Sequence, residues 1–303
     1  MSGASLSYAA VTPARNEAEH IARLGESLAS QSVPPTKWLI VDNGSTDDTV
    51  AVAHALAADH SWITVVSIPG ELNPVRGRPI VRAFTRALEE LDPAPDVVVN
   101  VDADVSMDAD YFERLVDRFL DDPQLGICSG SAFELSDGVW TQRHVTGSTV
   151  WGATRAYRWA CLQDVLPLEE RLGWDGLDEF KANARGWRTR TFTDIPFRHH
   201  RREGERDGER WRARAAQGAA AHYQGYAFWY LVMRALHNAR KEPGALGLIW
   251  GYLRALAARE PRCPDTEARA YLRDQQSLRN LARRFREASR PAATLDQPDR
   301  FRA

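Results

Sequence analysis

Cysteine is scarce in this chain of 303 residues, which has only Cys128, Cys161 and Cys263. The three are far apart and odd in number, so they fit neither a disulfide framework nor a zinc site. No apolar run follows a basic start at the N-terminus, so we expect no secretory signal. These features predict a protein of a reduced, cytoplasmic compartment.

Long hydrophobic runs are lacking as well. The apolar segment "GALGLIWGYLRALAA" (residues 244–258) is interrupted by Arg254 and is too short to span a bilayer. The segment is amphipathic, so its apolar face could pack in the core or lie on a membrane interface. Peripheral contact with the inner face of a membrane therefore remains open.

The charges are unevenly distributed along the chain. Residues 1–180 carry a formal charge of −15 and residues 181–303 carry +13, which together give the net charge of −2. A basic half indicates an anionic partner such as a diphosphate or a membrane surface, unless it docks on the acidic half. The arginines match no nucleic-acid-binding motif and have acidic neighbours, so we expect no nucleic-acid partner.

Short apolar runs alternate with segments of helical periodicity over the first two-thirds of the chain. This alternation predicts an α/β fold with a doubly wound, mostly parallel sheet. The expected strands are residues 7–12, 38–41, 63–68, 97–101 and 126–130, and the expected helices are 17–30, 46–58, 79–91 and 108–120.

The pattern changes near residue 205, after which no strand is indicated. Residues 208–240, 244–260 and 265–289 are predicted as three helices separated by proline and glycine. We therefore expect an α/β domain over residues 1–205 and a helical C-terminal extension over residues 206–303.

Polar clusters follow the predicted strands. They are "TPARNEAEH", "VDNGSTDDT" and "VDADV", with "NPVRGRP" between the third and fourth strands. In an open parallel sheet, ligands bind beyond the carboxyl ends of the strands. Asp102 and Asp104 are one residue apart and repel each other, so a cation, backbone donors or solvent must compensate their charge.

The segments "TPARNEAEHIARLGESLASQS", "WLIVDNGSTDDTVAVA" and "VVVNVDADVSMDADYFERL" carry a resemblance to a known family. In order, spacing and strand context, roughly residues 6–200 resemble a family 2 glycosyltransferase of the bacterial exopolysaccharide or capsule type. The resemblance implies a GT-A fold, a nucleotide-diphosphate sugar donor and a divalent metal, Mg²⁺ or Mn²⁺. It implies that Asp104 contacts the metal and that Asp102 holds the ribose or a metal-bound water.

The resemblance also implies which residues hold the donor nucleotide. Asp42 would accept a hydrogen bond from uracil, or else only cap the following turn. The residues themselves add that the charged run after the histidines, with Gly204 and Gly208, could close over the diphosphate through Arg201, Arg202 or Arg206, or else be an exposed charged linker. Together, the resemblance and the residues give as donor-binding candidates Pro13, Arg15, Glu17, Asp42, Arg76, Arg78, Asp102 and Arg201.

Two further clusters supply candidates for catalysis and metal binding. In "LGWDGLDEFKANARGWRT" the family's general base falls on Asp175, although Trp174 departs from the family pattern. Asp178 lies one helical turn later and is the alternative base. In "RHHRR" the resemblance implies one histidine ligand, His199 or His200, since side chains alternate along a strand and only one can face the metal.

The resemblance thus implies an inverting, metal-dependent glycosyltransferase that uses a nucleotide-diphosphate sugar, with a UDP-sugar favoured. The acceptor would be a glycan, a lipid-linked sugar or a small molecule, in the synthesis of a surface polysaccharide or glycolipid. Alternatives are glycosylation of a soluble secondary metabolite, or a sugar-nucleotidyltransferase. The chain lacks the glycine-rich loop that nucleotidyltransferases carry after the first strand, which counts against the last alternative.

Overall fold

The computed structural model describes residues 6–72, 75–143, 149–201, 210–240, 242–280 and 294–295. Within these residues, ten strands form one mixed sheet. The strands are β1 (Tyr8–Ala14), β2 (Lys37–Asp42), β3 (Ile63–Ser67), β4 (Val97–Val101), β5 (Val105–Met107), β6 (Leu125–Ser136), β7 (Val139–Gln142), β8 (Thr154–Arg158), β9 (Arg188–His199) and β10 (Thr294–Leu295).

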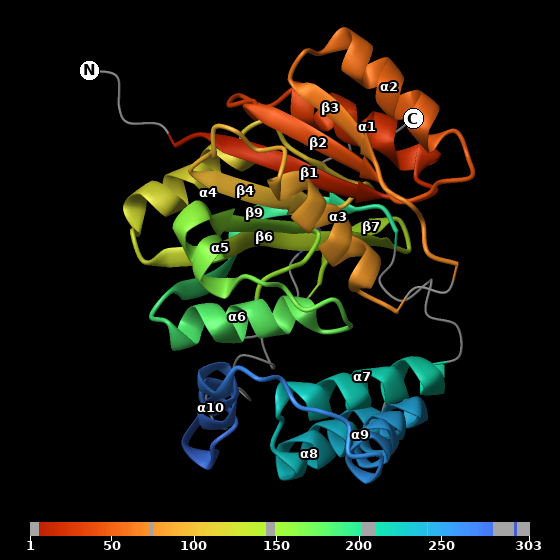
Figure 1. Cartoon of the computed structure of the whole chain (residues 1–303), viewed down its shortest axis with the longest axis vertical. Helices are drawn as coiled ribbons and strands as arrows, with labels where there is room; N and C mark the ends of the chain where they lie inside the picture. The colour runs from red at the N-terminus through yellow and green to blue at the C-terminus, as the bar shows by residue number, and fades with distance from the viewer. Residues whose placement is uncertain are drawn as a thin grey trace.

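Helices connect the strands and form most of the described chain after residue 209 (Figure 1). They are α1 (Ala18–Ala29), α2 (Thr49–Asp59), α3 (Arg78–Leu88), α4 (Tyr111–Asp121), α5 (Trp159–Val165), α6 (Trp174–Ala184), α7 (Arg210–Gln224), α8 (Phe228–Ala239), the 3₁₀ helix η1 (Pro243–Leu246), α9 (Gly247–Ala257) and α10 (Thr266–Gln275). The prediction of no strand after residue 205 is wrong for the short β10, which pairs with β7.

The strand order is β10-β7-β6-β8-β4-β1-β2-β3, and β9 pairs with both β5 and β6. Strands β3, β2, β1 and β4 run parallel, as the alternation of strands and helices predicts. Strand β8 is antiparallel to both β4 and β6. The mostly parallel α/β sheet is therefore confirmed, and the antiparallel strands extend it on one side.

Side chains of the central strands alternate between two hydrophobic cores. Tyr8 and Ala10 of β1 pack in one core with α1, α2 and α4, whereas Ala9 and Val11 pack in the other with α3, α5 and α6. This alternation follows from the two-residue period of a strand. Both faces of the sheet are covered, which is why the central strands read as continuous apolar runs.

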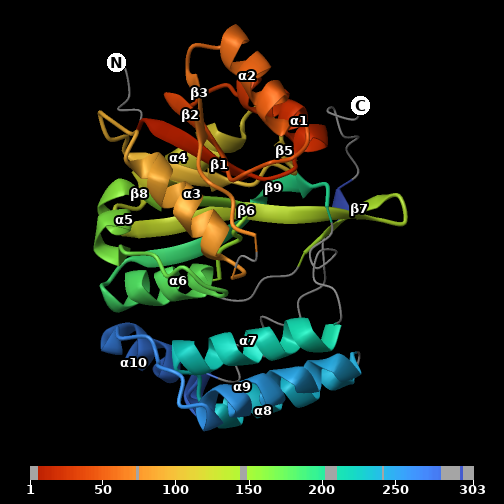
Figure 2. The same ribbon diagram turned by 45° about the vertical axis from the view of Figure 1, so that its right-hand side comes forward.

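The C-terminal helices lie at one end of the molecule, with α6 between them and the sheet (Figures 1 and 2). Gln224 Nε2 of α7 donates to the carbonyl oxygen of Gly173, the residue before α6, at 2.9 Å. Arg185 forms an ion pair with Asp265. The helical extension is thus joined to α6 by polar contacts.

The prediction of one helix over residues 208–240 is wrong, because α7 ends at Gln224 and α8 begins at Phe228. Gly225 has a φ of 85°, in the left-handed region that glycine adopts without a steric cost. Its amide donates to the His222 carbonyl oxygen and closes the last turn of α7.

The predicted boundary at residue 205/206 lies in residues 202–209, outside the described part of the chain, so this division remains a prediction. Residues 281–289 of the third predicted helix also lie outside it, as do Arg202 and Arg206, the alternatives to Arg201. Among the described helices, none has both the length and the apolar content that crossing a membrane requires.

Candidate active site

The parallel strands β1, β2 and β4 end at the same edge of the sheet. Ala14 pairs with Asp42 at the ends of β1 and β2, and Val11 pairs with Asn100 near the end of β4. Asp102 and Asp104 follow β4 directly, where the chain leaves the sheet. The polar clusters that follow these three strands therefore meet at one edge.

Strand β9 brings a histidine to this edge from a distant part of the sequence. His199 pairs with Val105 of β5, so the imidazole lies beside Asp104, and its Nε2 is 3.4 Å from Asp104 Oδ1. One ligand atom from each of Asp102, Asp104 and His199 lies within 4.8 Å of the other two. Two carboxylates and one imidazole form a donor set that fits a divalent metal ion.

Charges in this cluster perturb one another. Burial and the neighbouring Asp104 raise the pKa of Asp102 to about 6. Burial also acts to raise the pKa of Asp104, but the hydrogen bond from His199 and the charges of His199 and Arg201 outweigh it, so this pKa lies below its usual value. Burial disfavours the charged His199, yet Asp104 and Glu134 raise the pKa of its imidazole to about 10. His199 therefore carries a proton at neutral pH when only protein groups surround it.

Arg201 completes this cluster. Its guanidinium donates two hydrogen bonds to the carboxylate of Glu17, at 3.1 and 2.7 Å. The same guanidinium lies 3.4 Å from Asp104 Oδ2. Glu17 is buried, which raises the pKa of its carboxyl group, while Arg201 opposes that shift. Glu17 and Arg201, both predicted for the donor nucleotide, are thus brought together beside the predicted metal ligands.

His200 lies elsewhere. Its Nε2 is 2.8 Å from Ser106 Oγ, and its ring packs edge-on against Trp140. His200 is not part of the three-residue metal group found among the described residues. Of the two histidines predicted as alternatives, the geometry places His199, and not His200, beside Asp102 and Asp104.

Asp42 ends β2 and is buried. Its two carboxylate oxygens accept hydrogen bonds from the amides of Gly44 and Ser45, at distances of 3.1 Å and above. Gly44 has a φ of 75°, and a Cβ there would lie 2.7 Å from the Cα of Gly70. Asp42 therefore caps the following turn, and it does so at the same edge as Asp102.

A group of arginines lies around Glu71. Arg15 donates to the Glu71 carbonyl oxygen at 3.1 Å, and Arg78 lies 3.6 Å from its carboxylate. The buried Nε of Arg78 has no hydrogen-bond partner among the described residues. Pro13 is half-buried at the end of β1, and Arg76 is exposed just before α3. The remaining donor-binding candidates thus lie at the end of β1 and around the start of α3.

Asp175 lies in the first turn of α6, which begins after Gly173. Gly173 has a φ of 83°, and a Cβ there would lie 2.6 Å from Gln224 Nε2, so glycine is required at this position. The Asp175 carboxylate is half-buried and accepts a hydrogen bond from the amide of Gly176 at 3.1 Å. It retains acceptor positions for a substrate hydroxyl.

Asp178 is placed differently. Only 1% of its surface is exposed, and its carboxylate accepts hydrogen bonds from Arg155 at 3.0 and 2.7 Å and from the hydroxyl of Tyr157. Arg155 is also fully buried and pairs with Glu179 at 2.8 Å. The Asp178 carboxylate is enclosed by these partners, so the geometry does not support the alternative of Asp178 as the general base.

Two residues of the site were not predicted from the sequence. Arg155 on β8 pairs with Asn100 on β4 and donates to the carbonyl oxygen of Asp175, so it links the two acidic clusters. Glu134 on β6 is buried and lies 3.5 Å from His199 Nδ1. Charged residues within the strand-like segments "SGSAFEL" and "ATRAYR" were the available signal, because a buried charge requires a partner.

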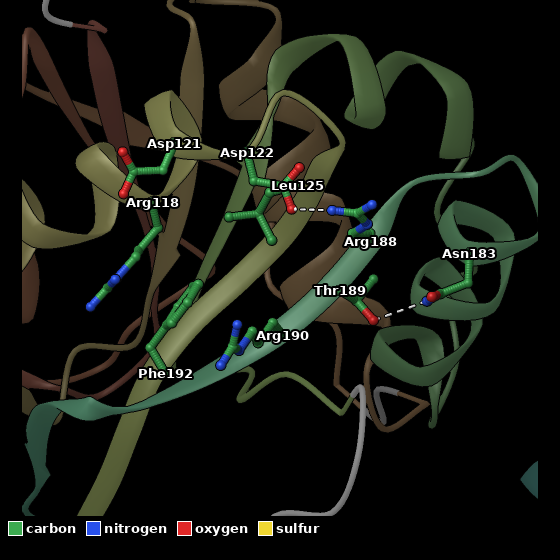
Figure 3. Close-up of a pocket in the computed structure, with 9 residues that line it drawn as sticks. All are labelled: Arg118, Asp121, Asp122, Leu125, Asn183, Arg188, Thr189, Arg190 and Phe192. Carbon is green, nitrogen blue, oxygen red and sulfur yellow. Dashed lines mark hydrogen bonds and ion pairs between the residues drawn. The ribbon is translucent and has the colours of Figure 1, made fainter. Parts of the chain in front are cut away.

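A separate cavity of about 380 Å³ lies around the starts of β6 and β9 (Figure 3). Glu134 and His199 mark the opposite ends of the same two strands. The guanidinium groups of Arg118 and Arg190 each lie 5.0 Å from the ring centre of Phe192 in its wall. None of the predicted site residues lines this cavity, so it is distinct from the candidate active site.

Comparisons with known proteins bear on the fold and on the family. Among solved structures, a mannosyltransferase, PcManGT from Pyrobaculum calidifontis in complex with GDP-Man and Mn²⁺, is 18% identical, with a TM-score of 0.57 over 94% of this chain and 85% of that one. TarS 1–349 from S. aureus in complex with UDP-GlcNAc is 17% identical, with a TM-score of 0.58 over 92% of each chain. At these identities the likeness confirms the GT-A fold.

A curated relative is the succinoglycan biosynthesis protein ExoA of Rhizobium meliloti (strain 1021). It is 33% identical over 117 residues, which are 38% of this chain and 33% of ExoA. The chain thus matches one third of the length of this relative. The profile of Glycosyl transferase family 2 matches residues 9–168, just over half of the chain. The match decides against a sugar-nucleotidyltransferase: this chain belongs to glycosyltransferase family 2.

Proposed function

We propose that this glycosyltransferase moves a sugar from a nucleotide-diphosphate donor to an acceptor hydroxyl with inversion at the anomeric carbon, and that it uses Mg²⁺ or Mn²⁺. One observation carries the proposal. Asp102, Asp104 and His199 come together within 4.8 Å at the edge where the parallel strands end. That edge is where ligands bind in sheets of this kind.

The metal would be held by Asp104 and His199, with Asp102 as a further ligand or as a contact to the ribose. When bound, a divalent cation neutralises the charge that develops on a leaving diphosphate. Asn100 supports this arrangement, because its Nδ2 donates to Asp102 at 3.3 Å and holds that carboxylate. The buried Oδ1 of Asn100 has no partner among the described residues, so it can accept a hydrogen bond from a ligand.

The donor nucleotide would lie across the ends of β1 and β2. We assign Asp42 to the base, Glu17 and Arg15 to the ribose, and Arg76 or Arg78 to the base or the phosphates. The Arg78 guanidinium is held 3.6 Å from the carboxylates of Glu71 and Glu170, and its buried Nε donates no hydrogen bond to a described residue, which supports its choice over Arg76. Arg201 would move from Glu17 to the diphosphate, since a guanidinium pairs well with phosphate oxygens.

Asp175 would act as the general base. A sugar hydroxyl is a weak nucleophile, and a carboxylate within hydrogen-bond distance can take its proton as it attacks. Attack from the face opposite the diphosphate inverts the configuration through an oxocarbenium-like transition state. Arg155 holds the backbone of Asp175 and the carboxylate of Asp178, so it fixes the position of the base.

We favour a UDP-sugar as the donor and an acceptor in surface polysaccharide or glycolipid synthesis. The structure of TarS contains UDP-GlcNAc, and a glucosyl-3-phosphoglycerate synthase from Mycobacterium tuberculosis with Mn²⁺ and UDP has a TM-score of 0.52. The name of ExoA refers to succinoglycan biosynthesis. An acceptor of this kind would place the enzyme at the cytoplasmic face of a membrane.

A donor panel tests the proposal. UDP-, GDP- and dTDP-sugars are screened for metal-dependent hydrolysis and for thermal stabilisation of the protein. A donor at about 100 times its Kd should stabilise the folded protein by roughly 2.7 kcal/mol, and only with Mg²⁺ or Mn²⁺ present. Stabilisation of equal size by every sugar nucleotide in the presence of a chelator would contradict the proposal.

A further inference from the structure

Helices α8 and α9 form the end of the molecule that lies furthest from the sheet, with α7 between them and the sheet (Figures 1 and 2). Their outer surface is unusually apolar. Trp229 is 43% exposed, Leu236 55% and Trp250 56%. We refer to the following exposed side chains as the apolar face: Phe228, Trp229, Leu236, Leu246, Trp250, Leu253 and Leu256.

The spacing of these residues shows that the exposure is systematic. Leu246, Trp250 and Leu253 are four and three residues apart, which places them on one side of η1 and α9. Trp229 and Leu236 are seven residues apart on α8 and share a side in the same way. Scattered exposed apolar residues are ordinary on protein surfaces, but contiguous stripes on two packed helices mark an interaction surface.

The packing beneath the apolar face explains why the large side chains point outward. Helix α9 contacts α7 through glycines, and a Cβ on Gly251 would lie 1.8 Å from the Ala215 carbonyl oxygen. A Cβ on Gly218 of α7 would lie 2.1 Å from the Leu248 carbonyl oxygen. The small residues let the backbones of α7 and α9 approach closely, so the bulky side chains of α9 are left on its outer side.

Positive charge accompanies the apolar face. Neither α8 nor α9 contains an acidic residue. The exposed Arg254 lies four residues after Trp250 on the same side of α9, and Arg234 is exposed on a different side of α8 from Trp229 and Leu236. Residues 210–260 contain eight basic and two acidic residues, a formal charge of +6. One of the two acids, Glu242, is paired with Arg214 at 2.6 Å.

We propose that the apolar face lies on an anionic lipid bilayer, with the helices parallel to the membrane surface. Indole rings at the lipid–water interface, apolar side chains below it and arginines beside anionic headgroups fit the composition of the face. A second copy of the chain is a poorer occupant, because two surfaces with the same positive charge repel each other. The proposal extends the proposed function but does not depend on the donor or the metal.

Vesicle co-sedimentation tests this proposal without donor or metal. The full chain is mixed with vesicles of phosphatidylglycerol and phosphatidylcholine in equal parts, and with vesicles of phosphatidylcholine alone. We expect binding to the anionic vesicles in about 20 mM salt and little in about 500 mM, since salt screens the arginines. Binding to the neutral vesicles should be much weaker.

Variants locate the contact. Trp229→Ser with Trp250→Ser should weaken binding about 100-fold, roughly tenfold for each half-exposed indole removed from lipid contact. Arg234→Gln with Arg254→Gln should weaken it about 25-fold, near fivefold per charge. Leu120→Ser is the matched control, because Leu120 is exposed to a similar degree on α4 but lies outside the apolar face.

The outcomes separate the lipid from other occupants. Absence of binding at low salt by a protein with native circular dichroism overturns the proposal. Sedimentation as a dimer that the tryptophan variant abolishes, without vesicle binding, overturns it in favour of a second copy. Loss of binding only in the two variant pairs supports it, whatever the result of the donor panel.

Discussion

Substitution of Arg201 should have opposite effects on the binding of the metal and on the binding of the nucleotide. Without ligands, its guanidinium contacts Glu17 at 2.7 Å and Asp104 Oδ2 at 3.4 Å. A metal that binds Asp104 must displace this positive charge, whereas a bound diphosphate would attract it. Arg201→Gln should therefore strengthen Mn²⁺ binding in the absence of nucleotide and weaken nucleoside-diphosphate binding.

The expected changes in Mn²⁺ and nucleotide affinity follow from the distances between these charges. Two unit charges at the observed 3.4 Å attract by roughly 5 kcal/mol at an effective dielectric constant near 20. Desolvation and side-chain ordering offset most of this, because partly exposed ion pairs contribute only about 1 kcal/mol net. We therefore expect Mn²⁺ to bind about fivefold more tightly to Arg201→Gln. Loss of a charge-assisted contact to phosphate, about 1.5–3 kcal/mol, should weaken nucleotide binding at least tenfold.

Isothermal titration calorimetry measures both quantities on the same protein. Mn²⁺ is titrated first, and the nucleoside diphosphate is then titrated at saturating Mn²⁺. Arg185→Gln is the matched control, because Arg185 forms an ion pair of 2.9 Å with Asp265 away from the site. If Arg201→Gln binds Mn²⁺ no more tightly than the wild type, Arg201 does not compete with the metal and the reasoning fails.

Three further substitutions test the other roles. Asp175→Asn should lower turnover by about 10² or more with little change in donor affinity, as measured by steady-state kinetics, and near-normal turnover would remove Asp175 as the base. Asp178→Asn should instead lower the free energy of unfolding by about 3 kcal/mol in urea denaturation, because it removes one of the two buried carboxylates that compensate Arg155; a stable variant with abolished turnover would reverse the two assignments. Glu134→Gln should weaken Mn²⁺ binding about tenfold or more, because Glu134 orients the His199 imidazole, and unchanged Mn²⁺ affinity would show that it does not.

The parallel half of the sheet could be predicted from local patterns alone. Residues 97–101 were expected as a strand and form β4 with the same bounds. Strands β8 and β9 were not predicted, because their charged residues hide the apolar pattern. Arg155 is tolerated inside β8 only because α6 supplies Asp178 and Glu179, 23 and 24 residues later in the sequence.

The sequence indicated which types of residue form the candidate site, but it could not distinguish between neighbouring residues of the same type. The sequence left His199 and His200 equal, and the pairing of His199 with Val105 separates them. Asp175 and Asp178 lie three residues apart in one helix, so periodicity could not tell them apart. Only the tertiary contact of Asp178 with the buried Arg155 does so.

The most direct test of the central claim is the binding of the donor nucleoside diphosphate to wild-type protein and to Asp104→Asn, each with and without Mn²⁺. Asp104 lies between His199 and Arg201 at the edge where the strands end. We predict Mn²⁺-dependent binding by the wild type, and loss of that dependence in a variant that keeps its native circular dichroism. Binding by Asp104→Asn with unchanged affinity and unchanged Mn²⁺ dependence would contradict the account.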